Sequence, residues 1–122
     1  MTKDNIILEK TLNFSLSAIE GYKKLIAQNE LVISKQFLRS STSIGANVNE
    51  AIAAQSKKDF ISKMAIASKE AREARYWLTL IEKSNIAVLD CLSLLKEIDE
   101  IIRIITAIVK TTQENLKEYS SI

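Results

Sequence analysis

The chain has 122 residues, with no proline, no histidine and only two glycines, and 17 basic against 15 acidic side chains leave a net charge of +2. So few turn-forming residues argue against a β-rich fold with many tight turns. The missing histidine excludes a Ser-His-Asp triad, a Cys-His pair and every histidine-containing zinc site, and the single Cys91 cannot form an intramolecular disulfide or a thiolate metal site.

The first predicted helix spans about residues 5–27. Its expected buried face follows alternating four- and three-residue steps. That row consists of Leu8, Leu12, Ser15, Ile19, Tyr22 and Ile26. Residues 28–30 are the expected break, because Asn29 tolerates the left-handed conformation that often ends a helix.

The second predicted helix spans about residues 31–54 and buries Phe37, Ser41, Ile44, Val48 and Ala51. Gly45 inside a helix costs about 1 kcal/mol relative to alanine, so we expect a neighbouring backbone to approach it closely. A polar row lies beside the apolar one, at Ser40, Ser43, Asn47 and Glu50. Two interpretations of this row remain open. Its side chains bond across helices or to water, or Asn47 and Glu50 contact a ligand or nucleic acid.

The third predicted helix spans residues 57–84 and starts at a capping box formed by residues 56–59, with Asp59 in place of the preferred Glu. Its apolar row is the most regular of the chain: Phe60, Met64, Ala67, Ala71, Ala74, Leu78 and Ile81. Residues 85–89 form the next connection, and Asp90 is the expected N-cap of the fourth helix.

The fourth predicted helix spans about residues 90–118. Its apolar row contains Cys91, Leu95, Ile98, Ile102, Ile105, Val109, Thr112 and Leu116. Four long helices with short connections predict an all-α fold, an antiparallel up-down-up-down four-helix bundle that forms one domain over residues 1–122.

Helices three and four carry more apolar residues than one buried stripe needs. The additional residues are Leu94, Ile101, Ile104 and Ile108 on helix four, and Ile61, Ile66, Trp77 and Leu80 on helix three. Either a wide core absorbs them or they form a second interface between subunits. We favour the second interpretation and predict a homo-oligomer.

Charge is distributed unevenly, since residues 57–84 hold seven basic and four acidic side chains. Basic residues near one helix face, beside an aromatic side chain, are typical of a phosphate-backbone contact. The predicted nucleic-acid-binding residues are Lys57, Lys58, Lys69, Arg72 and Tyr76. The alternative is an ordinary solvated face.

A carboxylate metal site is the main enzymatic possibility for a four-helix bundle. Without histidine it would use Glu50, Glu70 and Glu73, an oxygen-only set that suits Mg²⁺ or Ca²⁺. The simpler interpretation pairs Glu70 and Glu73 with Lys63, Lys69 and Arg72 at helical spacing. We therefore predict no enzymatic activity, no cofactor and no bound metal.

The sequence contains no apolar run long enough to cross a membrane, because residues 101–109 are few and include Arg103. Residues 1–10 include Asp4 and Glu9 and do not resemble a secretory signal. With no disulfide to form, the expected location is the cytoplasm.

Residues 36–51, 56–61, 69–73, 76–78 and 104–111 resemble the motifs of a bacterial four-helix-bundle family, named for reading frames in intervening sequences of 23S rRNA genes. The resemblance implies a ring-like homopentamer. Related accessory proteins of diversity-generating retroelements share that assembly and bind a reverse transcriptase and nucleic acid through a basic surface. Most members of the intervening-sequence family have no established activity. The recurring polar or aromatic positions are Arg39, Asn47, Glu50, Lys58, Asp59, Lys69, Glu70, Glu73, Tyr76 and Trp77.

Three functional hypotheses follow. The first is a non-enzymatic oligomer that contacts nucleic acid, or an enzyme acting on nucleic acid, through the basic face of helix three. The second is a structural or protein-interaction scaffold. The third is a bundle that binds a metal or small molecule through Glu50, Glu70 and Glu73.

Overall fold

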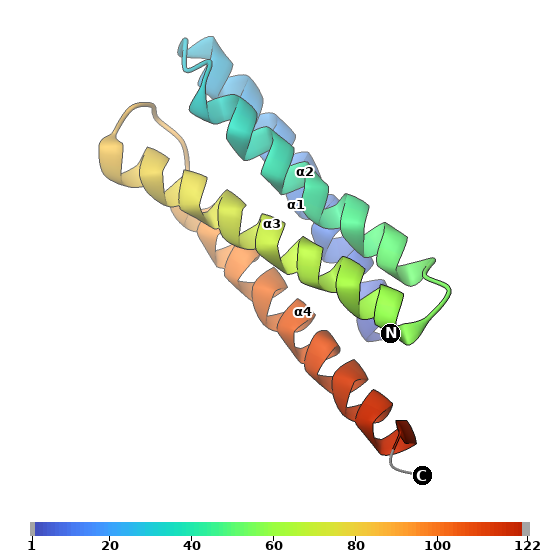
Figure 1. Cartoon of the computed structure of the whole chain (residues 1–122). Coiled ribbons are helices and arrows are strands. Elements are labelled where there is room, and N and C mark those ends of the chain that lie inside the picture. Colours follow the sequence, from blue (N-terminus) through green and yellow to red (C-terminus); the bar gives the residue numbers. More distant parts are fainter. Residues whose placement is uncertain (1, 121–122) are drawn as a thin grey trace.

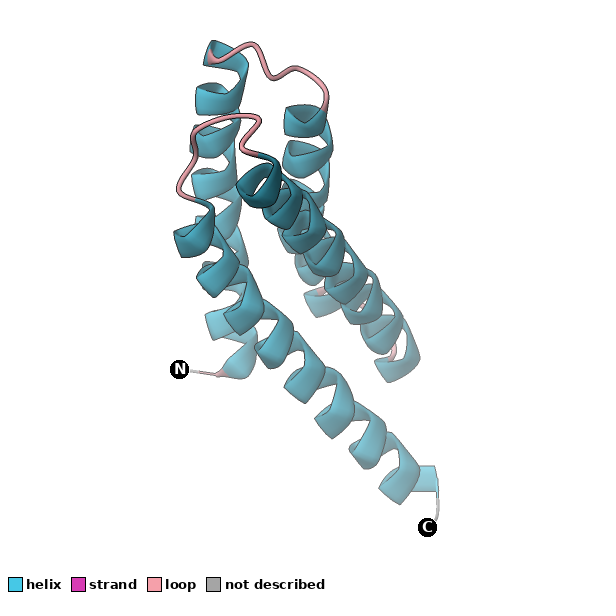
Figure 2. Ribbon diagram, turned by 90° about the vertical axis from the view of Figure 1, so that its left-hand side faces the viewer, coloured by secondary structure: helices cyan, strands magenta, loops and turns pink. Residues whose placement is uncertain are grey.

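The computed structural model describes residues 2–120, of which residues 119–120 are described by their backbone alone. These residues form four helices and no strand: α1 (Lys3–Ala27), α2 (Ile33–Ile52), α3 (Lys57–Ser84) and α4 (Cys91–Ser120). Successive helices run in opposite directions, and α4 extends past the ends of its neighbours (Figures 1 and 2). The prediction of an all-α antiparallel four-helix arrangement is confirmed.

Helix caps account for most of the helix bounds. The Ser56 hydroxyl accepts a hydrogen bond from the Asp59 backbone N–H at 3.0 Å, and the Asp90 carboxylate accepts one from Ser93 at 3.2 Å. Each bond satisfies a backbone donor that the first turn of a helix leaves free. Asn29 follows α1 with a φ of 65°, in the left-handed region. The predicted caps and the predicted break at Asn29 are confirmed.

The start of α2 differs from the prediction because the side chain that caps it belongs to Glu30, three residues before the helix begins. The side chain of Val32, which precedes the helix, makes no capping bond. The Glu30 carboxylate instead accepts hydrogen bonds from the backbone N–H groups of Val32, Ile33 and Ser34, at 3.3, 3.0 and 2.5 Å. Burial alone would raise the pKa of Glu30, but these backbone bonds outweigh burial and lower it. Glu30 therefore fixes α2 to begin at Ile33, two residues later than predicted.

The buried face of α1 lies one position before the predicted row. The buried residues are Ile7, Thr11, Phe14, Ala18, Gly21 and Leu25. In the predicted row Leu12 is 59% exposed and Ile19 is 37% exposed, so that prediction is wrong. Both rows have the same spacing, and a shift by one residue turns a helix by about 100°. Phe14, with 1% of its surface exposed, fixes which row faces inward.

The predicted rows of α2 and α3 face the core. All five predicted residues of α2 are buried, and six of the seven on α3 are buried, with Phe60 half-buried. Gly45 lies against α1, where a Cβ atom would come 3.5 Å from the backbone oxygen of Thr11. The expected close approach of a neighbouring backbone at Gly45 is therefore confirmed.

Helix α4 uses both of its apolar rows inside the chain. Ile98 and Ile105 are fully buried, and Leu94, Ile101 and Ile108 are no more than 8% exposed. Because α4 packs against both α3 and α1, two neighbouring rows are needed to fill the core. The prediction that Leu94, Ile101 and Ile108 pack between subunits is wrong; the wide core absorbs them.

Candidate nucleic-acid interface

The predicted basic residues lie on the outer surface of α3. Lys58, Lys69 and Arg72 are exposed, and Tyr76 has 58% of its surface exposed. Their spacing places them on the side of the helix opposite its buried row. Lys57 is also exposed but points about 100° away from this line. We call Lys58, Lys69, Arg72 and Tyr76 the basic row.

Glu70 and Glu73 of α3 pair with α2 and not with the basic row. Glu70 and Glu73 were expected to pair with lysines and arginines of their own helix, but both pair with Arg39 of α2. Lys63 reaches Glu50 of α2, with 3.6 Å between Nζ and Oε2. Among the described residues, no carboxylate forms an ion pair with Lys58, Lys69 or Arg72.

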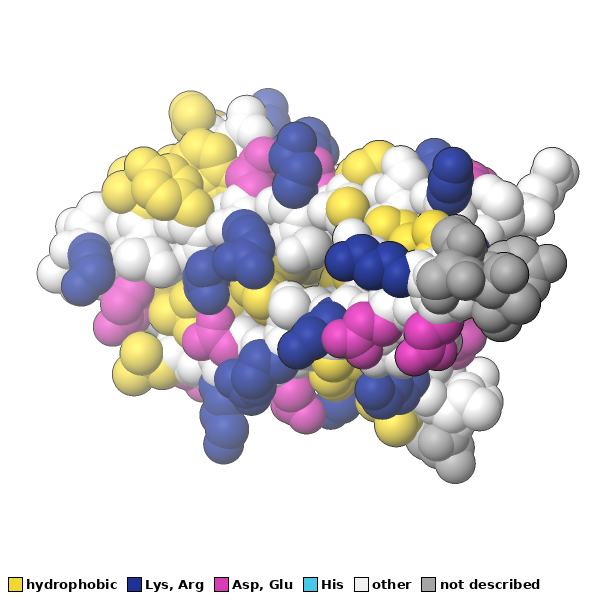
Figure 3. Space-filling model, turned by 60° about the horizontal axis from the view of Figure 1, so that its bottom comes forward, with side chains coloured by type: hydrophobic (Ala, Val, Ile, Leu, Met, Phe, Trp, Pro, Cys, Tyr) yellow, Lys and Arg dark blue, Asp and Glu magenta, His cyan; other side chains and the backbone are white. Residues whose placement is uncertain are grey.

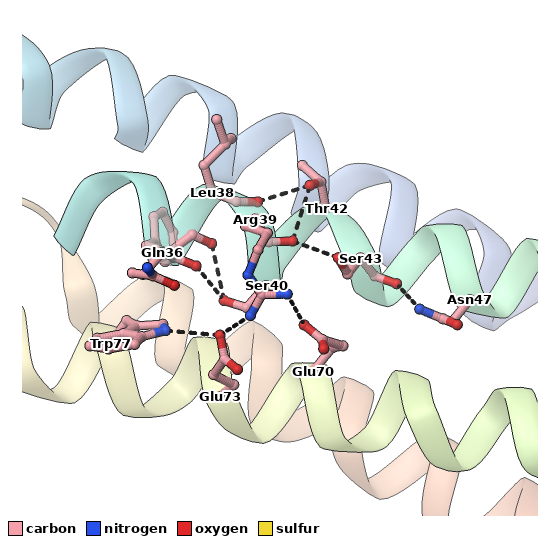
Figure 4. A network of polar contacts seen from close by, with 11 residues as sticks. Gln36, Leu38, Arg39, Ser40, Thr42, Ser43, Asn47, Glu70, Glu73 and Trp77 are labelled. Atoms are coloured by element: carbon pink, nitrogen blue, oxygen red, sulfur yellow. Dashed lines mark hydrogen bonds and ion pairs between the residues drawn. The ribbon is translucent and has the colours of Figure 1, made fainter. Parts of the chain in front are cut away.

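Arg39 forms the centre of a polar network between α2 and α3 (Figure 4). Its Nη1 donates to Glu70 Oε2 at 3.1 Å, and its Nη2 donates to Glu73. The indole N–H of Trp77 donates to the same oxygen of Glu73 at 3.1 Å. The hydrogen bond to Glu73 raises the pKa of Arg39, despite partial burial, and the negative charges of Glu70 and Glu73 add to it. Four of the recurring family positions are thus one connected group.

The aromatic pair on α3 joins this network to the basic row. The rings of Tyr76 and Trp77 meet edge to face, with centroids 5.2 Å apart and planes inclined by 68°. Trp77 is half-buried and bonded to Glu73, whereas Tyr76 faces solvent. Tyr76 is therefore the aromatic side chain available to a partner at this surface.

The polar row of α2 is bonded within its own helix. The side chains of Ser40, Ser43 and Asn47 donate to backbone carbonyls one turn earlier, at 2.9, 2.7 and 2.8 Å (Figure 4). Glu50 is exposed and pairs with Lys63. The cross-helix part of the first interpretation is therefore wrong for these three donors, because each side chain reaches the second lone pair of a carbonyl one turn earlier on α2.

Asp59 has a local role at the start of α3. Its backbone N–H bonds to Ser56, and its exposed carboxylate lies in the first helical turn. A negative charge there interacts favourably with the helix dipole. Its place in the motif is explained by helix initiation.

The described residues offer no site for a metal or a reactive thiol. They contain no group of three or more Asp, Glu, Cys or His side chains arranged to hold a metal ion. Glu50 binds Lys63, and Glu70 and Glu73 bind Arg39, so the three proposed ligands do not converge. Burial raises the pKa of the Cys91 thiol to about 11, with further contributions from the charges of Glu82 and Asp90.

Two further contacts between helices were not predicted. Arg75 of α3 bonds Asp99 of α4 at 3.0 Å, and Lys10 of α1 bonds Glu100 of α4 at 2.8 Å. The Lys10 contact borders a groove of about 440 Å³ between α1 and α4, with Ile6 and Ile104 in its lining. Spacing along one helix cannot reveal pairs whose partners lie on different helices.

No helix in the described part of the chain is both long enough and apolar enough to cross a membrane.

On the face in Figure 3, basic and acidic side chains are interspersed, and hydrophobic ones gather near the end where α3 joins α4.

Comparisons with known proteins agree with the motif resemblance. The pattern of 23S rRNA-intervening sequence proteins matches residues 3–107. A crystal structure of a protein of unknown function, from the S23 ribosomal protein family of Bacteroides thetaiotaomicron VPI-5482, has a similar fold with a TM-score of 0.86. The two sequences are 43% identical over 89% of this chain and 99% of the other. No curated protein matches the chain.

Proposed function

This chain belongs to the 23S rRNA-intervening sequence protein family, and we propose that it is a non-enzymatic homo-oligomer that contacts nucleic acid through the basic row of α3. It works without a cofactor, and we place it in the cytoplasm. The observation that carries the proposal is that, among the described residues, no carboxylate forms an ion pair with Lys58, Lys69 or Arg72. Cations that are free of carboxylates can neutralise phosphates and so release the counterions condensed on the nucleic acid, which supplies most of the affinity in sequence-independent binding.

The dimensions of the basic row suit a nucleic-acid backbone. Lys58 and Tyr76 are 18 residues apart on one helix, which corresponds to about 27 Å. That length covers about eight base-pair steps of a duplex, at about 3.4 Å each along one strand. Tyr76 offers an exposed ring for stacking against an unpaired base.

Assembly strengthens this surface. The family resemblance suggests a ring-like pentamer, and we propose that this chain forms one. Each copy then contributes one basic row, and the fields of neighbouring rows add. A chain with a net charge of only +2 thereby presents a locally strong positive field.

The alternative function is a scaffold that binds proteins. It is favoured by the alternation of basic and acidic side chains on the face in Figure 3. In that case, Lys58, Lys69 and Arg72 serve solubility alone.

The test compares two variants of equal net charge. Lys58→Glu/Lys69→Glu/Arg72→Glu reverses the basic row, and Lys3→Glu/Lys35→Glu/Lys96→Glu reverses three exposed lysines on α1, α2 and α4. We expect fluorescence anisotropy with labelled single-stranded and duplex RNA to show at least about a 100-fold loss for the first variant. The second variant should lose less than about tenfold.

Two results would contradict the proposal. Equal losses in both variants would mean that net charge alone controls binding. A wild-type protein that binds neither the single-stranded nor the duplex RNA would exclude this proposal and favour the scaffold function.

A further inference from the structure

The groove between α1 and α4 has no part in the proposed function. It has a volume of about 440 Å³ and lies beside the first turns of α1, where α4 continues past the end of that helix (Figures 1 and 2). Its lining extends over residues 3–10 of α1 and residues 100–107 of α4. Seven residue steps along each helix make the groove about 10 Å long.

The floor of the groove is apolar. Ile6 and Ile104 are half-buried on opposite walls, and Ala107 leaves the groove open because its side chain is a single methyl group. The neighbouring residues Ile7 and Ile101 are no more than 1% exposed, so the core is closed beside the groove. An aliphatic ligand in the groove would remove apolar surface from water without disturbing that core.

The lining also carries three cations and one carboxylate. The carboxylate of Glu100 pairs with Lys10, with 2.8 Å between Oε1 and Nζ. Among the described residues, no carboxylate forms an ion pair with Lys3 on the α1 wall or with Arg103 on the α4 wall. The apolar floor is therefore flanked by one cation on each wall that has no carboxylate partner.

The electrostatic field at Glu100 is positive. The hydrogen bond from Lys10 and the charge of Lys10 lower the pKa of Glu100, despite the opposing effect of desolvation, and the charges of Arg103 and Lys96 lower it further. An anionic group of a ligand placed beside Arg103 would experience the same kind of field.

Three acidic residues neighbour the lining without belonging to it. Asp4 and Glu9 are each one residue from a lining lysine, which turns them about 100° around α1. Glu97 lines a separate cavity of about 150 Å³, which lies against the Lys10–Glu100 pair. The excess of positive charge in the lining therefore remains.

We propose that this groove binds a single-chain amphiphile with an anionic head, such as a medium-chain fatty acid, with the chain over Ile6 and Ile104 and the head between Lys3 and Arg103. The inference is separate from RNA binding and from self-association. The guanidinium fork of Arg103 matches a carboxylate or a phosphate, and Lys3 adds a second charge. A mostly apolar cleft of a few hundred Å³ with a few polar groups is typical of a small-molecule site.

The size of the groove favours a small molecule over a protein. Neighbouring helix axes lie about 10 Å apart, so the groove covers roughly 100 Å². A protein partner covers about 800 Å², and the groove would be only a small part of such a contact. An extended chain of about nine carbons is about 10 Å long, because each bond of about 1.5 Å advances it by about 1.3 Å. Decanoate has such a chain and one carboxylate, and is the probe.

The first test compares ligands by isothermal titration calorimetry. We expect the wild type to bind one decanoate per chain. Decan-1-ol, which has the chain without the charge, and butyrate, which has the charge with a short chain, should each bind at least about tenfold more weakly. Decyl phosphate distinguishes the two sources of the head, because tighter binding than decanoate assigns a phosphate and weaker binding assigns a carboxylate.

The second test removes the two cations. Lys3→Gln/Arg103→Gln should lower the affinity for decanoate at least about tenfold and leave that for decan-1-ol nearly unchanged. Lys35→Gln/Lys83→Gln removes the same net charge from exposed lysines outside the groove and is the matched control. It should change the affinity for decanoate less than about twofold.

The third test fills the groove. Ala107→Trp places a large side chain in the lining and should lower the affinity for decanoate and decan-1-ol at least about tenfold. Ala46→Trp places the same side chain at an exposed position of α2 and should have no effect. Circular dichroism checks that each variant keeps its helices.

Three results would overturn the inference: a wild type that does not bind decanoate, equal affinities for decanoate and decan-1-ol, or equal losses in the two double variants. RNA affinity of Lys3→Gln/Arg103→Gln should stay within about threefold of the wild type, because neither residue belongs to the basic row. Failure at the groove would therefore leave the proposed function to be judged by its own test.

Discussion

The outer surfaces of α1–α2 and of α3 carry opposite chemistry on similar helices. Residues 11–19 and 40–49 have no charge and expose Leu12 and Leu16, whereas α3 exposes cations that no described carboxylate pairs with. The net charge of +2 indicates neither the uncharged surface nor the basic one. The difference shows that the position and pairing of charges, more than their sum, indicate which surface suits which partner.

Arg39 lies between the two surfaces and keeps them distinct. It directly precedes the uncharged segment 40–49 of α2 and pairs with Glu70 and Glu73 of α3. One guanidinium therefore pairs two carboxylates that could otherwise pair with lysines of α3. It leaves the basic row positive.

The largest expected effect concerns α4, whose residues Leu94, Ile101 and Ile108 are buried inside the chain and are not available to join copies. Ile101→Ala removes a side chain that is 1% exposed, so we expect the free energy of unfolding to fall by about 2–5 kcal/mol. Ile66→Ala, at 39% exposure, should cost less than about 1 kcal/mol. Urea unfolding followed by circular dichroism measures both changes. A small cost for Ile101→Ala, accompanied by loss of the oligomer, would restore the interface first predicted for α4.

Glu30→Ala tests the cap that fixes the start of α2, the helix that carries the uncharged segment 40–49. Loss of this cap should lower the free energy of unfolding by about 1 kcal/mol. The folded-state pKa of Glu30 is lowered from about 4.5, so its contribution is present above that pH and disappears as the pH falls through the folded-state value. Unfolding curves at pH 7 and pH 3 should therefore differ more for the wild type than for the variant. An equal pH dependence in both proteins would remove Glu30 from this role.

The smallest expected effect is on RNA affinity, and it tests the role of Arg39. Arg39→Ala frees Glu73, which lies one turn from Lys69, and a pair between them would weaken the basic row. We expect about a threefold loss of RNA affinity, with less than about 1 kcal/mol lost in stability because the pairs are partly exposed. Lys35→Ala removes the same charge from α2 and is the matched control. If both variants bind RNA equally, Arg39 contributes only its own charge.

Periodicity and caps predicted most of the fold. The row from Met64 to Ile81 on α3 keeps its four- and three-residue spacing without a break, and its inward face was predicted correctly. On α1 two rows with equal spacing compete, and the row that faces inward buries Phe14 and packs Thr11 against α2. That contact depends on the assembled bundle, so the sequence of α1 by itself does not contain the answer.

The candidate site was predicted in its residues but not in its connections. Lys58, Lys69, Arg72 and Tyr76 share an outer face, as helical spacing indicates. The partner of Glu70 and Glu73 was missed because Arg39 lies more than 30 residues away and spacing rules describe only one helix. The cap by Glu30 was missed because it precedes the helix by three residues, outside the usual N-cap position.

The most direct test of the unpaired basic row is the salt dependence of RNA binding. We would titrate single-stranded RNA with the wild type and with Lys58→Ala/Lys69→Ala/Arg72→Ala at several salt concentrations. If three phosphates are neutralised by these side chains, the slope of log K against log salt should be less steep in the variant by about 2. Parallel lines for the two proteins would contradict the assignment of this surface to nucleic acid.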